Sequence, residues 1–250
     1  MDRVKQFIIV ATALLMAACS SAPKQPIAFN AETIKGESNR IAIQMGAVPE
    51  AITTFPGAGC LLCVGIAMAA HSDLSSHVHS LKPDELASLP QRLADTLRAQ
   101  GAEVSILKEP VDLEALSSNS GKGDDSRQTE KDFRPLSERL GADKLLVITT
   151  YNSGVLRKYS QYVPVDVPEA FFWGVSYMVD LKSNTYVWYA PLNRSRKAEG
   201  AWNEPPNFPG LTNAYYQVLA ESTDYLAGEL SNKSDASSAK RVATATVQAK

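Results

Sequence analysis

The sequence predicts an α/β fold, a mixed β-sheet covered by helices in a sandwich-like single domain. Segments in which apolar residues alternate with polar ones, as in strands, are interspersed with segments in which they recur every three or four residues, as in helices. Residues 145–148 are apolar at every position, which is typical of a strand buried on both faces. The predicted order of elements, β-α-β-α-β-β-β-α, contains crossovers and a hairpin, and therefore indicates parallel and antiparallel pairs in one sheet.

The first three predicted elements are two strands and the helix between them. Residues 40–45 and 103–107 alternate apolar and polar side chains, so both are predicted strands. The intervening helix carries a leucine at every fourth position: Leu89, Leu93 and Leu97. Pro90 is tolerated only in the first turn of a helix, and Gly101 offers the left-handed conformation that ends one.

A second helix and the centre of the sheet follow. Residues 133–140 place Leu136 and Leu140 on one helix face, and Gly141 is expected to end this helix. Residues 144–150 contain the continuous apolar run. Because both faces of such a strand must be covered, we expect it at the centre of the sheet.

The C-terminal part is predicted to be a β-hairpin followed by a long helix. Residues 169–181, in which Trp173, Val175, Tyr177 and Val179 alternate, and residues 185–191 are predicted strands separated by a short polar turn. Apolar residues between 211 and 230 fall at helical spacing, and Thr212 or Asn213 is the expected N-cap. The apolar face of this helix is expected to cover the sheet.

Three segments are predicted to flank or interrupt the ordered domain of residues 39–230. Residues 19–38 lack apolar periodicity and suit a flexible tether. Residues 110–131 include a stretch rich in serine, glycine and aspartate, and are an expected mobile loop. Residues 231–250 contain no aromatic side chain, so little apolar area is available to offset the entropy of ordering, and a disordered tail is expected.

Residues 1–18 are predicted to be a lipoprotein signal peptide. Arg3 and Lys5 precede a short apolar run, which gives way to small residues and then to Cys19. This arrangement is typical of a secretory signal, and the run is too short to span a membrane, which takes about 20 residues. The residues before Cys19 resemble a lipobox, in which the cysteine is acylated, for instance with palmitate, and becomes the first mature residue. The serine that follows implies, by resemblance, a lipid anchor in the outer membrane with the chain on its periplasmic face.

The composition argues against nucleic acid as a partner. The chain carries 25 basic and 27 acidic residues, a net charge of −2, and its 44% hydrophobic content suits one core. The longest basic clusters, Arg157-Lys158 and residues 194–197, are short, whereas nucleic-acid-binding surfaces carry extended basic patches. The expected partners are therefore the membrane, through the N-terminal lipid anchor, and an envelope protein.

Residues 58–70 do not fit the α/β scheme. This apolar segment contains Cys60 and Cys63, and the three histidines of the chain follow shortly after it: His71, His77 and His79. The two cysteines could form a local disulfide, since exported proteins are oxidised, or lie as free thiols in a buried apolar helix.

Two further interpretations of these residues remain open. A redox-active Cys-x-x-Cys needs a lowered thiol pKa, whereas apolar neighbours raise it. A zinc site built from both cysteines and two histidines has good cysteine spacing, but His77-x-His79 lacks the gap of three to five residues that is usual in structural sites.

Other catalytic motifs are missing from the sequence. It contains neither Gly-x-Ser-x-Gly nor Gly-x-x-x-x-Gly-Lys, and no histidine follows His79 to serve as a general base. We therefore expect no enzymatic activity, no cofactor and no metal. The alternative is a periplasmic thiol-disulfide oxidoreductase, or a metal-binding protein, that uses Cys60 and Cys63.

Several segments resemble a group of uncharacterised Gram-negative outer-membrane lipoproteins. The resembling segments are residues 60–63, 143–148, 177–185 and 202–216. More distantly, the order of elements is similar to the small α/β domain of periplasmic envelope-assembly factors: the amino-terminal domain of the Tol-Pal translocation protein, the curli secretion lipoprotein, and lipoproteins that activate peptidoglycan synthases. Those domains bind proteins, so this resemblance implies a non-catalytic protein that binds another envelope component.

The loop before the last helix is the candidate surface for that partner. It contains Trp202, Pro205, Pro206 and Phe208, and it joins the hairpin to the terminal helix. Loops held by a rigid scaffold carry function disproportionately, and exposed tryptophan is enriched in interfaces. The alternative is that Trp202 and Phe208 fill the end of the sheet.

Overall fold

The computed structural model describes residues 24–36, 39–119, 126–204 and 207–231. The predicted signal peptide, Cys19, Pro205, Pro206 and the tail from residue 232 onward lie outside the described residues.

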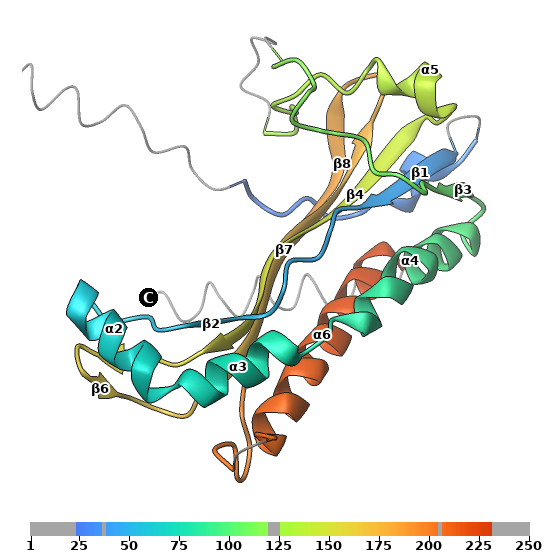
Figure 1. Ribbon diagram of the computed structural model, residues 1–250. Helices are drawn as coiled ribbons and strands as arrows, with labels where there is room; N and C mark the ends of the chain where they lie inside the picture. Colours follow the sequence, from blue (N-terminus) through green and yellow to red (C-terminus); the bar gives the residue numbers. More distant parts are fainter. Residues whose placement is uncertain (1–23, 37–38, 120–125, 205–206, 232–250) are drawn as a thin grey trace, which may run out of the picture.

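A six-stranded mixed sheet forms the centre of the molecule (Figure 1). Its strands are β1 (Arg40–Met45), β2 (Ile52–Thr54), β3 (Glu103–Ile106), β4 (Lys144–Leu156), β7 (Glu169–Asp180) and β8 (Thr185–Lys197). The order across the sheet is β3-β1-β4-β7-β8, and β2 pairs in parallel with the second half of β4. Strands β3, β1 and β4 run parallel to one another, whereas β7 and β8 run antiparallel to their neighbours. A second, two-stranded sheet consists of β5 (Tyr159–Ser160) and β6 (Val163–Pro164).

The helices cover the two faces unequally. They are η1 (Ala31–Ile34), α2 (Leu61–Ala70), α3 (Ser72–Ser80), η2 (Asp84–Ser88), α4 (Leu89–Arg98), α5 (Leu136–Leu140) and α6 (Pro209–Leu230). Figure 1 shows α3, α4 and α6 together along one face of the sheet, whereas α5 lies at the opposite end from α2. The main core, between the sheet and α3, α4 and α6, includes the fully buried side chains of Trp188 and Tyr215. A smaller core packs α5 and the preceding loop on the other face.

The prediction of the fold class is confirmed. Alternation on β1 sends Ile41 and Ile43 into the main core and Ala42 into the smaller one, and β4 is central, with residues 145–148 buried on both faces. The predictions made two strands too short. Strand β4 continues beyond the predicted residue 150 to Leu156, through a bulge after Thr150, and β8 continues beyond the predicted residue 191 to Lys197.

The close approach of β2 to β4 depends on Gly154. A Cβ atom there would lie 1.9 Å from the carbonyl oxygen of Ile52, and Gly154 has a φ of +144°. A side chain at this position would therefore push β2 away from the sheet.

Parts of the expected tether and mobile loop are packed on the domain. In the tether, Ile27 exchanges backbone hydrogen bonds with Tyr189, and Phe29 is buried in the main core. In the loop, Val111 is buried and both its backbone polar groups bond to the side chain of Gln44. Residues 24–36 and the described parts of 110–131 thus make contacts with the domain that the local composition does not reveal, because scattered apolar residues gain burial.

The terminal helix also begins earlier than predicted. α6 starts at Pro209 after Phe208, without a side-chain N-cap. Thr212, an expected cap, lies inside the first turn, where its hydroxyl donates to the carbonyl oxygen of Asn207 at 3.0 Å.

Candidate functional site

An apolar projection at one end of the sheet is the candidate functional site. Helix α2 and the β5–β6 hairpin extend together past β2 (Figure 1). Most of the large hydrophobic side chains that are exposed in the described residues belong to this projection: Leu61 (94%), Leu62 (67%), Ile66 (44%), Met68 (57%), Tyr162 (48%), Val163 (62%) and Val165 (39%). We call residues 58–70 together with residues 159–165 the apolar tip.

The exposure of α2 follows from its composition. Residues 58–70 contain no charged side chain, so apolar groups surround the helix on every side. Only one stripe is buried, where Cys63 and Ala67 pack against Tyr159 of the hairpin. A helix that is apolar all round is usually buried in a core or in a membrane. Here it is neither buried in the domain nor, at ten residues, long enough to cross a bilayer.

Backbone contacts join the tip to the end of the sheet. The amide of Tyr159 donates to the carbonyl oxygen of Pro56 at 2.8 Å, and that of Gln161 donates to Gly57 at 3.1 Å. Gly57 has a φ of +86°, and a Cβ atom there would lie 1.9 Å from the carbonyl oxygen of Tyr159. Only glycine permits both this turn and this close approach. The connection before α2 is thus held directly against the hairpin.

A disulfide between Cys60 and Cys63 closes the first turn of α2. The two Cα atoms are 5.0 Å apart, and the sulfur of Cys60 accepts a hydrogen bond from the amide of Cys63 at 3.0 Å. The Tyr162 hydroxyl lies 3.7 Å from the same sulfur and must be the donor, because a disulfide sulfur has no proton. Cys60 is exposed, whereas Cys63 is only 3% exposed. The disulfide therefore fixes the first turn of α2, and the hydrogen bond from Tyr162 connects that turn to the hairpin.

Beneath the tip lies a cluster of rings around His71. Its imidazole stacks on Phe55 at 5.9 Å between ring centroids and meets Tyr159 edge-on at 6.0 Å. Burial, together with the positive charge of Arg157, lowers the pKa of His71. Burial and this neighbouring cation thus both disfavour the charged form of His71 beneath the tip.

A groove adjoins the tip on the side of β2. Its volume is about 440 Å³, and it runs between β2, α2 and α3. Its walls include Phe55, Val64 and Met68, with His79 at its margin. The exposed helix and the groove form one continuous, largely apolar surface, which suits a hydrophobic partner better than a polar substrate.

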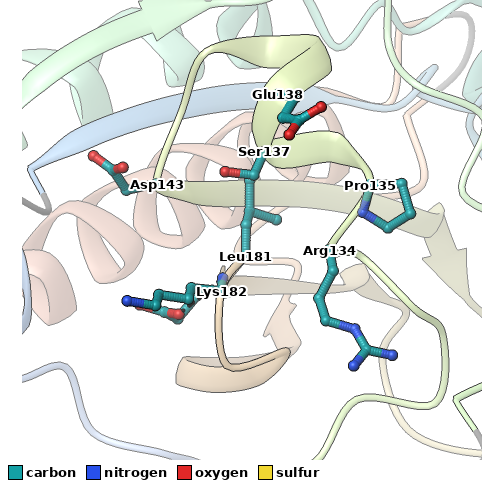
Figure 2. Close-up of a pocket in the computed structure, with 8 residues that line it drawn as sticks. Arg134, Pro135, Ser137, Glu138, Asp143, Leu181 and Lys182 are labelled. Atoms are coloured by element: carbon teal, nitrogen blue, oxygen red, sulfur yellow. Dashed lines mark hydrogen bonds between the residues drawn. The ribbon is translucent and has the colours of Figure 1, made fainter.

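A larger pocket at the opposite end of the sheet is polar. It measures about 580 Å³ and lies beside α5 (Figure 2). Two of its charged groups pair with neighbours: Arg134 pairs with Asp132 at 2.8 Å, and Asp143 pairs with Arg40 at 2.8 Å.

No catalytic arrangement links the groups of this pocket. The Ser137 hydroxyl donates to the carbonyl oxygen of Ala142 at 3.0 Å, so it has no base to activate it. Figure 2 shows the guanidinium of Arg134 pointing away from Glu138. The lining groups of this pocket stabilise turns and do not form a nucleophile and base pair.

The loop predicted to bind a partner is largely structural where it is described. Phe208 is 6% exposed and lies in the main core, 5.2 Å from the ring of His77. Trp202 is half-buried against the same core, and the guanidinium of Arg157 lies 5.2 Å from its ring. The burial of Phe208 agrees with the alternative in which this ring fills the end of the sheet, here between α3 and α6.

The structure separates the histidines that the zinc hypothesis would combine. The Nε2 atom of His77 lies 2.7 Å from the hydroxyl of Thr212, and His79 faces Glu50 at 3.8 Å. Within the described ranges, no three histidine, cysteine or acidic side chains gather as metal ligands would. Because both sulfurs are bonded to each other, neither is available as a thiolate ligand.

No family model matches the chain, and no curated protein sequence matches it. Solved structures of similar fold include the PelC dodecamer from Paraburkholderia phytofirmans, at 13% identity, with coverage of 80% of this chain and 93% of that one and a TM-score of 0.28. Protein XCC0632 from Xanthomonas campestris, of family DUF330, is 8% identical, with coverage of 77% and 83% and a TM-score of 0.35. Lipoprotein GNA1162 from Neisseria meningitidis is 15% identical, with coverage of 72% and 99% and a TM-score of 0.25. These likenesses to bacterial envelope proteins are distant, and the proposals below do not rest on them.

Sequence reasoning found half of the apolar tip. The segment from 58 to 70 was recognised as anomalous, but one hypothesis buried it in the core, whereas the structure exposes it. The hairpin was missed altogether, because strands of two residues show no periodicity. The available signal was Tyr162, Val163 and Val165, a cluster of apolar residues in a segment without a partner pattern.

Proposed function

We propose that the protein is an outer-membrane lipoprotein, anchored by lipid at Cys19, whose periplasmic domain binds another envelope component without catalysing a reaction. The observation that carries this proposal is the exposure of the apolar tip. Soluble domains rarely leave contiguous large side chains in water, and patches of this kind mark interaction sites. A single exposed leucine would carry no such meaning, but in the tip Leu61, Leu62 and Val163 are exposed together with four further large apolar side chains.

The absence of catalysis is supported by the state of the reactive side chains. In the described part of the chain, Ser137 and Thr212 donate to backbone carbonyl oxygens, and His77 contacts a hydroxyl that is already used in this way. General acid-base chemistry needs a base within reach of an available nucleophile. Neither the polar pocket nor the tip provides such a pair.

The proposal is tested in two steps. First, Cys19→Ala should leave an uncleaved precursor, whereas the native chain should be shorter, acylated and found in outer-membrane fractions. Second, a photo-crosslinking side chain at position 61 should form adducts in intact cells, whereas the same side chain at Tyr151, which is 56% exposed on β4, should form few. A cleaved chain that lacks acyl groups, or equal adducts at both positions, contradicts the proposal.

One observation favours a second candidate, a thiol-disulfide oxidoreductase. Cys60 is exposed at the N-cap of α2 while Cys63 is buried behind it, an arrangement that permits attack on the outer sulfur. The apolar side chains around the pair argue against a reactive thiolate, because they raise the pKa of a thiol. A Cys63→Ala chain that accumulates a mixed disulfide with another envelope protein would favour this second function.

A further inference from the structure

We infer that the envelope component bound by the apolar tip is the lipid bilayer itself, into whose interface α2 and the β5–β6 hairpin insert. This inference rests on the proposed function and specifies its partner. The tip would lie in the membrane surface and would not span it. In agreement with this, the described residues contain no helix that is long and apolar enough to cross a membrane.

The chemistry of the tip suits the boundary between lipid headgroups and acyl chains. Leu61, Leu62 and Val163 are its most exposed side chains, and no charge interrupts residues 58–70. Interfacial elements bury apolar groups about 5–10 Å deep at the acyl boundary. Tyr162 adds a ring with a polar end, the kind of side chain that is enriched at headgroup level.

The charges nearest the tip are already paired within the protein. Lys158 bonds to Glu169 at 2.7 Å, and Lys197 bonds to Asp166 at 2.5 Å. Arg157, a third cation at the base of the tip, is only 8% exposed, donates to the backbone carbonyl oxygen of Asp166 and lies against the ring of Trp202, so the base of the tip offers little accessible positive charge to anionic headgroups. Binding should be driven by apolar burial, and it should depend little on salt or on lipid charge.

The predicted lipid anchor holds the domain close to a bilayer. Cys19 stands five positions before Lys24, and five residues span at most about 17 Å. Lys24 is fixed to the domain, because its ammonium group donates to the carbonyl oxygen of Gln128 at 3.1 Å and lies 4.0 Å over the ring of Tyr186. The longer tether predicted for residues 19–38 is thus reduced to a short link.

A short link favours the bilayer over other occupants. Linked binding events reinforce each other, because the first raises the effective concentration of the second. An acyl group linked to the domain at Lys24 keeps the whole domain at the bilayer surface, so lipid is present around it at a high effective concentration. A second copy of the chain or a periplasmic protein would have to reach the tip from solution. The tip alone needs only modest affinity for lipid under these conditions.

The experiment uses the mature chain without its acyl group. Residues 20–250 are exported behind a signal peptide that is not lipidated, so that the disulfide can form in the periplasm. The purified protein is mixed with vesicles of phosphatidylethanolamine and phosphatidylcholine, with or without phosphatidylglycerol, and floated in a density gradient at low and high salt. Leu61→Glu and Val163→Glu test the tip, and Tyr151→Glu is the control, because Tyr151 is exposed to nearly the same extent as Val163 but lies outside the tip.

The native chain and the Tyr151→Glu chain should float equally with both vesicle types and at both salt concentrations. Each tip substitution should lower the bound fraction at least tenfold without changing the melting temperature. Flotation that requires phosphatidylglycerol and low salt, flotation that survives both tip substitutions, or no flotation of the native chain overturns the inference.

The failure of this inference is distinguishable from the failure of the proposed function. If the native chain stays with the unbound fraction but forms dimers that Leu61→Glu dissociates, the occupant is a second copy. If the crosslinker at position 61 captures proteins and no lipid in cells, the occupant is a protein. Both outcomes reject the bilayer and leave the tip as a binding site, whereas a tip without adducts of any kind rejects the proposed function as well.

Discussion

Replacing Trp202 by alanine is expected to destabilise the fold without weakening partner binding. Trp202 is half-buried against the main core, and the guanidinium of Arg157 lies over its ring at 5.2 Å. Arg157 is itself buried, and its side chain donates to the backbone carbonyl oxygen of Asp166. The indole therefore covers a cation that joins the end of β4 to the segment before β7.

The size of the effect follows from this burial. Truncating a fully buried tryptophan to alanine lowers the free energy of unfolding by about 3–5 kcal/mol. For a half-buried tryptophan the loss should be roughly 2 kcal/mol. Loss of the cation–π contact adds about 0.5–1 kcal/mol. In a domain of this size, a loss of about 2–3 kcal/mol should lower the melting temperature by roughly 5–10 °C.

Thermal and urea unfolding of the mature chain measure this prediction. Asn203→Ala is the matched control, because its side chain is exposed on the same loop and should change stability by less than about 0.5 kcal/mol. Phe208→Ala gives the largest loss of stability expected for a ring of this loop, since Phe208 is buried in the main core. An unchanged melting temperature for Trp202→Ala, with loss of a bound envelope component, would refute this reasoning and restore the loop as the partner surface.

Two further predictions concern the disulfide and the histidines. Changing Cys60 and Cys63 together to alanine should lower the free energy of unfolding by about 1–3 kcal/mol and leave cells without a phenotype; a mixed disulfide with another protein, trapped by Cys63→Ala alone, contradicts this. Burial lowers the pKa of His71 and of His77 in the folded state, so the unfolded chain takes up their protons first as pH falls. Stability should therefore be constant above about pH 7 and decline below about pH 6.5, and urea unfolding of His77→Gln should show a smaller decline than the native chain.

Local pattern was sufficient for the elements that pack in regular layers. The four-residue spacing of Leu89, Leu93 and Leu97 placed α4, and all three side chains are fully buried. The ends of the long strands were missed for a different reason. Beyond Thr150 the chain reads Tyr-Asn-Ser-Gly, which has no strand periodicity, yet it continues β4 because β2 and β7 supply backbone partners on both sides. Pairing between distant segments, not propensity, decides such positions.

The candidate site was harder to predict, because exposure is a property of the tertiary structure. An apolar run such as residues 61–70 has the same composition whether a core covers it or not. What leaves it uncovered is the position of β2 and β5 at the end of the sheet, which no local pattern records. Phe208 illustrates the converse error, since an aromatic residue in a proline-rich loop suggests an exposed surface but here fills the core.

The tip is held in its exposed conformation by contacts that do not involve a partner. An isolated ten-residue helix is marginal in water, and one with exposed leucines would be expected to fold back onto the domain. Three constraints oppose this collapse: the disulfide closes the first turn of α2, the hydroxyl of Tyr162 bonds to Cys60, and Gly57 fits directly against Tyr159. The apolar surface is therefore organised before binding, so that association does not incur the conformational entropy of ordering it. A tip that existed only as a by-product of core packing would not require these constraints, and their presence supports the proposal that the exposed segment binds a partner.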